Sequence, residues 1–284
     1  MYTGIPGSGL FAISPDLETW TPLNAHDGRL KANIHGLVAF VDPRGRKRIA
    51  VAQNDEQRVL VLDAADGRVL QVLEKPRGGE FGGGRGAAEA NAYYSARRRH
   101  VKGDGNPSVF AVTDVTYLDG KLYCVTGYCD GDFVLTAELH GEGGEGGEGG
   151  EEGEEGEGSW RWGTVAWGGK GTGAGQFTTA HGVTAHDGHI YVANRESFQV
   201  VKFRPDGSLV EVLPDIPHGS RICNVAKAQG SPGGGGVAGG GAAAGAAAAT
   251  ATAGGHFYMN ALAPLGKDGS SDIDSDSYSG SDTN

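Results

Sequence analysis

GQFTTAHGVTAHDGHIYVANRESFQVVKFRPDGSLVEVL, residues 175–213, contains four short apolar segments separated by polar turns. We predict one β-strand in each segment, at residues 182–185, 190–193, 198–204 and 209–213. The pairs Asp187-Gly188 and Asp206-Gly207 are dipeptides that join antiparallel strands. This stretch therefore predicts a sheet of four antiparallel strands.

The same pattern recurs along the chain. Copies or parts of copies lie at residues 9–23, 34–73, 112–139 and 217–226, the last of which resumes at 256–264. Four antiparallel strands in roughly 40 residues have the size of one blade of a β-propeller. We therefore predict an all-β fold, a propeller of the six-bladed type in which about five blades are recognisable and the ring is incomplete.

Three Gly-rich segments interrupt these copies. They cover residues 78–106, 141–158 (Gly/Glu-rich) and 229–255 (Gly/Ala-rich). Such compositions cannot bury enough apolar surface to offset the entropy lost on ordering, so we predict disordered inserts. The predicted propeller covers residues 1–267, and residues 268–284 form an acidic, Ser/Asp-rich disordered tail.

The acidity of the chain comes from these segments. The net charge is −11, but residues 141–158 hold eight glutamates and residues 268–284 hold five aspartates. Without those thirteen charges the remainder is about +2. Because binding to phosphate backbones needs a basic surface, the sequence argues against a nucleic-acid partner.

The chain has three cysteines, too few for a disulfide framework in a protein of this size, which favours a reducing compartment. The N-terminal residues lack the basic and apolar parts of a signal peptide, and no apolar run reaches the length of a membrane span. We expect a soluble monomer, with the cytoplasm favoured and no membrane partner.

Three histidines begin predicted blades and are each followed by glycine: His35, His181 and His218. The innermost strands of propeller blades line a common axis, so these side chains are expected to converge. Three histidines with an open fourth position suit a catalytic zinc ion. The alternative is that His-Gly merely suits the turn into an inner strand.

Three segments resemble one enzyme family. VTDVTYLDGKLYCVTGYC (112–129), WGGKGTGAGQFTTAHGVTA (167–185) and IYVANRESFQVVKF (190–203) are similar to NHL-repeat β-propellers and, among these, to peptidyl-α-hydroxyglycine α-amidating lyase (peptidylamidoglycolate lyase). The resemblance implies an NHL-type propeller with a zinc-dependent lyase site. It also implies cleavage of an α-hydroxyglycine to an amide and glyoxylate.

The resemblance assigns residues to that site. His35 and His181 match two of the family's zinc ligands, Tyr128 matches its catalytic tyrosine in Gly-Tyr-Cys, and Arg195 matches its catalytic arginine. Tyr128 could move a proton and Arg195 could hold a carboxylate. A calcium ion is implied by the resemblance alone. The alternatives are that Tyr128 only lines the channel and that Arg195 only binds Glu196 or a backbone carbonyl.

Two functions remain open from the sequence. One is a lyase, or a relic of one, acting on a small-molecule or peptide substrate at the channel mouth. The other is a propeller without catalytic activity, whose channel face binds a protein or a small ligand. Bound zinc distinguishes the two.

Overall fold

The computed structural model describes residues 1–96, 110–141, 158–213, 222–227, 246–248 and 257–261. In this part of the chain the strands form five antiparallel sheets. The first contains β1 (Tyr2–Ile5), β2 (Gly9–Ile13) and β3 (Trp20–Leu23). The second contains β4 (Ile34–Val41), β5 (Lys47–Gln53), β6 (Arg58–Asp63) and β7 (Val69–Leu73). The third contains β8 (Val112–Leu118), β9 (Lys121–Thr126), β10 (Phe133–His140) and β11 (Ser159–Gly168).

The fourth sheet contains β12 (Ala180–His186), β13 (His189–Asn194), β14 (Gln199–Phe203) and β15 (Leu209–Leu213). These are the four strands predicted from residues 175–213. The fifth sheet has β18 (Phe257–Ala261) between β16 (Ile222–Lys227) and β17 (Ala246–Ala248). The helical segments are η1 (Gly28–Lys31), α1 (Ala87–Ser95) and η2 (Arg195–Ser197).

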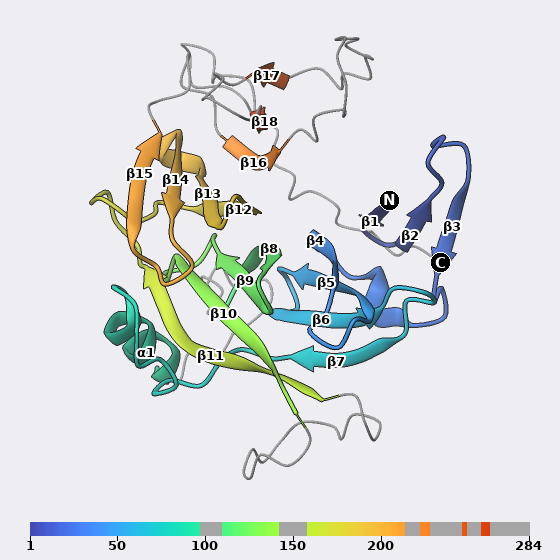
Figure 1. Cartoon of the computed structure of the whole chain (residues 1–284), viewed down its shortest axis with the longest axis horizontal. Coiled ribbons are helices and arrows are strands. Elements are labelled where there is room, and N and C mark those ends of the chain that lie inside the picture. The colour runs from blue at the N-terminus through green and yellow to red at the C-terminus, as the bar shows by residue number, and fades with distance from the viewer. Residues whose placement is uncertain (97–109, 142–157, 214–221, 228–245, 249–256, 262–284) are drawn as a thin grey trace, which may run out of the picture.

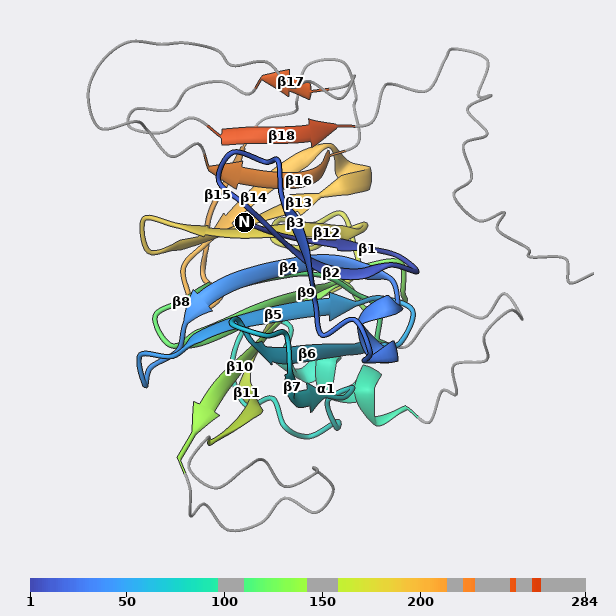
Figure 2. The same cartoon turned by 90° about the vertical axis from the view of Figure 1, so that its right-hand side faces the viewer.

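The sheets are arranged as the blades of a β-propeller. The first strand of each four-stranded sheet lies innermost, and consecutive inner strands touch: β4 contacts β8, β8 contacts β12 and β12 contacts β16. Figure 1 shows the sheets radiating from this centre, and Figure 2 shows β4, β12 and β16 following one another across the molecule. The all-β propeller prediction is confirmed, with five sheets among the described residues.

The core lies between neighbouring sheets rather than in one central layer. Side chains alternate between the faces of a strand, so a blade with neighbours on both sides buries both faces. Every residue of 48–53, within β5, is buried. Aromatic rings fill the space between the third and fourth sheets, where Trp167 lies 6.1 Å from Phe203 between ring centroids. This packing fixes the angle between blades.

The prediction of a disordered insert at 78–106 is wrong for its first part. Residues 87–95 form α1, which lies beside β11 (Figure 1). Its sequence, AAEANAYYS, is rich in good helix formers, and it buries Ala90 and Tyr94 in the core between the second and third sheets. The glycine content of residues 78–106 led to the prediction of disorder, although a short segment within them has apolar side chains that can be buried.

Three strands were also missed. β1 lies before the first predicted copy, at residues 9–23, and pairs with β2. β11 follows the Gly/Glu-rich insert and pairs with β10, which precedes the insert. β11 is therefore the fourth strand of the third sheet. β17, of three residues, lies inside the predicted insert 229–255. The resumption of the fifth sheet after that insert is confirmed, because β18 pairs with β16. Within the described residues, no helix is long and apolar enough to cross a membrane.

Candidate functional site

The inner strands of the last four sheets share one irregularity, a β-bulge near the start of the strand. The bulged residues are His35 in β4, Thr113 in β8, His181 in β12 and Cys223 in β16. A bulge leaves one residue out of the ladder and redirects its side chain. The equivalence predicted for His35 and His181 is therefore confirmed by the strand register.

The bulged residues connect each sheet to the next. The ring nitrogen Nδ1 of His35 lies 2.7 Å from the carbonyl oxygen of Thr113, and Nδ1 of His181 lies 2.7 Å from that of Cys223. Between them, the hydroxyl of Thr113 donates to the carbonyl of Ala180 at 2.7 Å. A carbonyl only accepts, so Nδ1 of each histidine carries the proton and Nε2 keeps its lone pair.

Burial keeps both imidazoles neutral. It lowers the pKa of His35, and it lowers the pKa of His181 to about 4, with the neighbouring His35 as the next cause. Removing a cation from water disfavours the charged form, so each ring stays unprotonated at Nε2 near neutral pH. A metal-binding histidine commonly has this arrangement, with its other nitrogen bonded to a backbone carbonyl.

The four residues assigned by resemblance lie together. The ring centroids of His35 and His181 are 4.8 Å apart, and the Tyr128 ring lies 5.9 Å from the first and 5.4 Å from the second. The guanidinium carbon of Arg195 lies 5.6 Å from the centroid of the Tyr128 ring. Residues that are 160 positions apart in the sequence thus meet at the axis. Their chemical roles remain predictions.

Tyr128 is held in an unusual backbone conformation. Its φ angle is +56°, in the left-handed region, and its side chain is 45% exposed. The turn that carries it is fixed by contacts on both sides. Lys170 donates to the carbonyl oxygen of Cys129 at 2.9 Å, and a Cβ added at Gly127 would lie 2.4 Å from the carbonyl oxygen of Ala180. A bulky residue kept in this region and exposed is typical of a functional position.

Arg195 begins η2 and is anchored through its backbone, whose N–H donates to Thr179 at 2.9 Å. Its Nη1 donates to Glu196, so the predicted contact with Glu196 exists. Burial acts to lower the pKa of Arg195, but the adjacent Tyr128, Cys223 and Glu196 outweigh it and the pKa is raised. Its Nε is buried and has no hydrogen-bond partner among the described residues. The arginine therefore stays charged and keeps a donor for an anion.

The third predicted metal ligand is His218. It lies outside the described residues, and Cys223 occupies the bulge of β16. Its predicted role as a metal ligand therefore stays a prediction. Within the described residues, no three His, Cys, Asp or Glu side chains are placed to hold a metal ion. The calcium ion implied by resemblance likewise stays a prediction.

Sequence reasoning missed Thr113 and Cys223. The signal was present for one of them, since Ile222-Cys223-Asn224 aligns with Ile34-His35-Gly36 once the bulges are matched. This equivalence was missed because the search was for repeated histidines, and the bulged position of β16 holds a cysteine. The three cysteines are free in the structure, as expected.

Asp114 joins the second, third and fourth sheets. Its Oδ2 accepts from the backbone N–H of Val183 at 2.9 Å, and its Oδ1 accepts from that of Val115 at 2.8 Å. Burial raises its pKa to about 7 although both bonds act to lower it. Gly36 lets the carboxylate approach, since a Cβ there would lie 2.1 Å from Oδ1. The residue beside Thr113 thus fixes the spacing of the blades that carry both histidines.

Comparisons with known proteins show a similar arrangement of strands and no sequence relative. No family model matches the chain, and no curated protein matches it. Among solved structures, a β-propeller domain from Myceliophteria thermophila is 10% identical with a TM-score of 0.42 over 79% of this chain and 57% of its own. A protein of unknown function from Bacteroides caccae is 13% identical, with a TM-score of 0.40 over 79% of this chain and 60% of its own.

A putative 6-phosphogluconolactonase from Bacteroides uniformis is 12% identical, with a TM-score of 0.39 over 77% of this chain and 53% of its own. The chain therefore spans between 53% and 60% of the length of these three structures.

Proposed function

We propose that this propeller is an NHL-type lyase, similar to peptidyl-α-hydroxyglycine α-amidating lyase, whose site is formed by His35, His181, Tyr128 and Arg195. The observation that carries the proposal is the pair of neutral imidazoles 4.8 Å apart between centroids. Each has Nδ1 bonded to the next sheet and Nε2 unprotonated.

Two ligands of a zinc site fit this arrangement. The third is proposed to come from outside the described residues, and His218, four positions before β16, is the candidate. Zinc, when bound, would polarise the hydroxyl oxygen of the substrate. The protein's own contribution is to hold both imidazoles in one tautomer through the carbonyls of Thr113 and Cys223.

The remaining groups suit the substrate proposed. An α-hydroxyglycine carries a carboxylate, for which Arg195 offers a permanent charge and its Nε donor. In the reaction the bond between the carbon and the amide nitrogen breaks, the hydroxyl loses its proton and the nitrogen gains one. The ring of Tyr128 lies beside both imidazoles, and its hydroxyl is proposed to move that proton. The products are an amide and glyoxylate.

A propeller without catalytic activity is the second candidate. One finding favours it: the described residues do not contain three groups placed to hold a metal. In that case the exposed Tyr128 and the charged Arg195 would form a binding surface for a protein or small ligand at the channel face.

Zinc binding and lyase turnover separate the candidates. Equilibrium dialysis with elemental analysis should give one zinc per chain for the wild type and none for His35→Ala/His181→Ala. The control His26→Ala/His189→Ala, which changes a surface and a turn histidine, should keep the metal. The zinc-loaded protein should release glyoxylate from an N-acyl-α-hydroxyglycine, and Tyr128→Phe should abolish the release while leaving zinc bound. A wild type that binds no zinc would leave only the second candidate.

A further inference from the structure

The exposed apolar side chains of the described residues gather on the first sheet. Seven large hydrophobic residues are exposed, and four of them lie within residues 1–20: Met1, Ile5, Leu17 and Trp20. Trp20 is 50% exposed, although tryptophan is usually buried in large part. Figure 1 shows β1, β2 and β3 together at one end of the series of sheets. The series therefore ends in an apolar surface.

The strand register separates the two faces of this sheet. Leu10, Ala12 and Leu23 pack toward the second sheet, and Leu30 of η1 and Ile34 of β4 complete the same core cluster. Side chains alternate along a strand, so the residues between them point to the opposite side. We call that side the free face, and its side chains are Thr3, Ile5, Phe11, Ile13, Trp20 and Pro22.

The centre of the free face is aromatic. The rings of Phe11 and Trp20 lie 6.4 Å apart between centroids. The indole Nε1 of Trp20 donates to the carbonyl oxygen of Leu17 at 3.2 Å, so the polar atom of the ring is already satisfied. Ile5, which is 37% exposed, adds an aliphatic side chain to the same face from β1. A partner can therefore cover this surface without leaving the indole donor unpaired.

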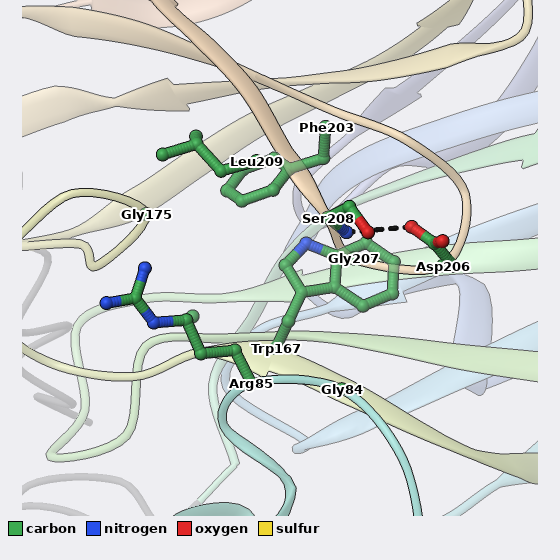
Figure 3. Close-up of a pocket in the computed structure, with 10 residues that line it drawn as sticks. Gly84, Arg85, Trp167, Gly175, Phe203, Asp206, Gly207, Ser208 and Leu209 are labelled. Atoms are coloured by element: carbon green, nitrogen blue, oxygen red, sulfur yellow. Dashed lines mark hydrogen bonds between the residues drawn. The ribbon is translucent and has the colours of Figure 1, made fainter.

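The contact between the third and fourth sheets shows a similar aromatic pair in its covered state. Trp167 packs against Phe203 with ring centroids 6.1 Å apart, and Leu209 lies beside them (Figure 3). Trp167 is 0% exposed there, whereas Trp20 is 50% exposed. Pairs of tryptophan and phenylalanine at almost the same spacing thus occur in both places, and the pair on the first sheet is uncovered.

The composition of the free face indicates a second copy of this chain as its partner. The face has no charged side chain, so it offers no ion pair to a charged protein or ligand. An uncharged, apolar face is complementary to itself, and two sheets pack face to face about 10 Å apart through such side chains. The net negative charge, which would repel a second copy, comes from residues 141–158 and 268–284, outside this sheet. Because the opposite face of the sheet already packs on the second sheet, a second copy would continue the same stacking.

The outer edge of the first sheet is less suited to association. Its edge strand β3 carries Pro22, which has no N–H to donate to an added strand. A proline on an edge strand is one of the ways in which proteins prevent pairing between sheet edges. Association is therefore expected through the free face and not by extension of the sheet.

We propose that two copies of this chain associate through the free faces of their first sheets. A two-fold axis would bring the same face of both copies together. Trp20 would contribute most, because tryptophan is among the residues that dominate the binding energy of protein interfaces. This association is independent of the proposed lyase chemistry. The monomer expected from the sequence is the competing prediction, and the same experiment decides between the two.

Sedimentation equilibrium of the full chain at a series of concentrations tests the proposal. The apparent mass should rise from that of one chain to that of two. Trp20→Glu would bring two carboxylates into the interface and should weaken the association at least about tenfold. Ile5→Lys, at an exposed position on another strand, should have the same effect. The control Val41→Glu changes a side chain that is 52% exposed on the second sheet, and it should leave the association unchanged.

Acrylamide quenching of tryptophan fluorescence gives a second measurement. Trp20 is the one exposed tryptophan of the four, so quenching of the wild type should fall as the association rises. The proposal is overturned if the wild type has the mass of one chain at every concentration, if either Trp20→Glu or Ile5→Lys associates as strongly as the wild type, or if Val41→Glu weakens the association equally. A wild type of single-chain mass in which removal of residues 262–284 increases the quenching would show that this segment, and not a second copy, covers the free face.

Discussion

Gly36→Ala tests whether the close approach of the second and third sheets fixes the fold at the axis. The new Cβ would lie 2.1 Å from Oδ1 of Asp114 and 2.8 Å from its Cα. Ordinary contact begins at 3.4 Å, so the backbone of β8 would have to retreat by about 0.6 Å, the difference between 3.4 Å and 2.8 Å. The carboxylate has less room still and must leave its position.

The expected loss follows from these two displacements. Overpacking of a dense interior costs about 1–3 kcal/mol. Moving the carboxylate away from Val183 leaves a buried N–H without an acceptor, which costs about 1–3 kcal/mol more. The two effects share one residue and are not fully additive, so the free energy of unfolding should fall by about 2–5 kcal/mol. Such a change is a large fraction of the stability of a typical domain.

Urea denaturation followed by tryptophan fluorescence measures this loss. The control is Gly28→Ala, at a glycine where an added Cβ meets nothing within 4 Å, and it should change stability by less than about 0.5 kcal/mol. In a double-mutant cycle, Gly36→Ala combined with Asp114→Ala should cost less than the sum of the single changes. A Gly36→Ala protein as stable as the Gly28→Ala control would refute the inter-sheet contact described here.

Three other outcomes are expected. Burial raises the pKa of Asp132 to about 7, above its unfolded value of about 3.9, so the folded state binds a proton that the unfolded chain has released. Its contribution to stability is therefore present at low pH and is lost between about pH 4 and pH 7, by up to about 1.4 kcal/mol per pH unit. In urea denaturation at a series of pH values, Asp132→Asn should remove this dependence of the unfolding free energy on pH. The similar pH dependence that arises from Asp114 should remain. Lys170→Met should remove the bond to the carbonyl oxygen of Cys129 and lower stability by about 1 kcal/mol, with faster amide hydrogen exchange confined to that turn. Tyr94→Ala, in α1, should lower the free energy of unfolding by about 3–5 kcal/mol, and a loss below 1 kcal/mol would show that α1 is not part of the core.

The sheets could be predicted because their signals are local. Asp187-Gly188 adopts positive φ at both residues, as the dipeptide predicts, and the strands on each side pair as expected. The missed elements lack such a signal. β11 is separated from its partner β10 by the Gly/Glu-rich segment. α1 is a short helix, and its apolar residues are buried only because the helix packs on a neighbouring sheet, which its own sequence does not indicate.

The histidine pair was predictable for a different reason. His35 and His181 carry the same tripeptide pattern at the start of a blade, so a repeat revealed them. The bulges that redirect their side chains were not predictable, because the register of a strand depends on its neighbour and not on its own sequence. For the same reason Cys223, the bulged residue of β16, was overlooked.

The hydrogen bonds of the two histidines show how the site depends on assembly. The tautomer of His35 is set by a carbonyl of the third sheet, and that of His181 by a carbonyl of the fifth. Neither the second nor the fourth sheet alone can fix the tautomer of its histidine, since in water Nδ1 would exchange between donor and acceptor roles. The exposed Tyr128 adds a strained backbone that only the contacts of its turn maintain. The geometry of the site thus depends on how the sheets pack against one another. A substitution at an interface between two sheets should therefore alter the tautomers and positions of the two histidines even when each sheet keeps its own strand pairing.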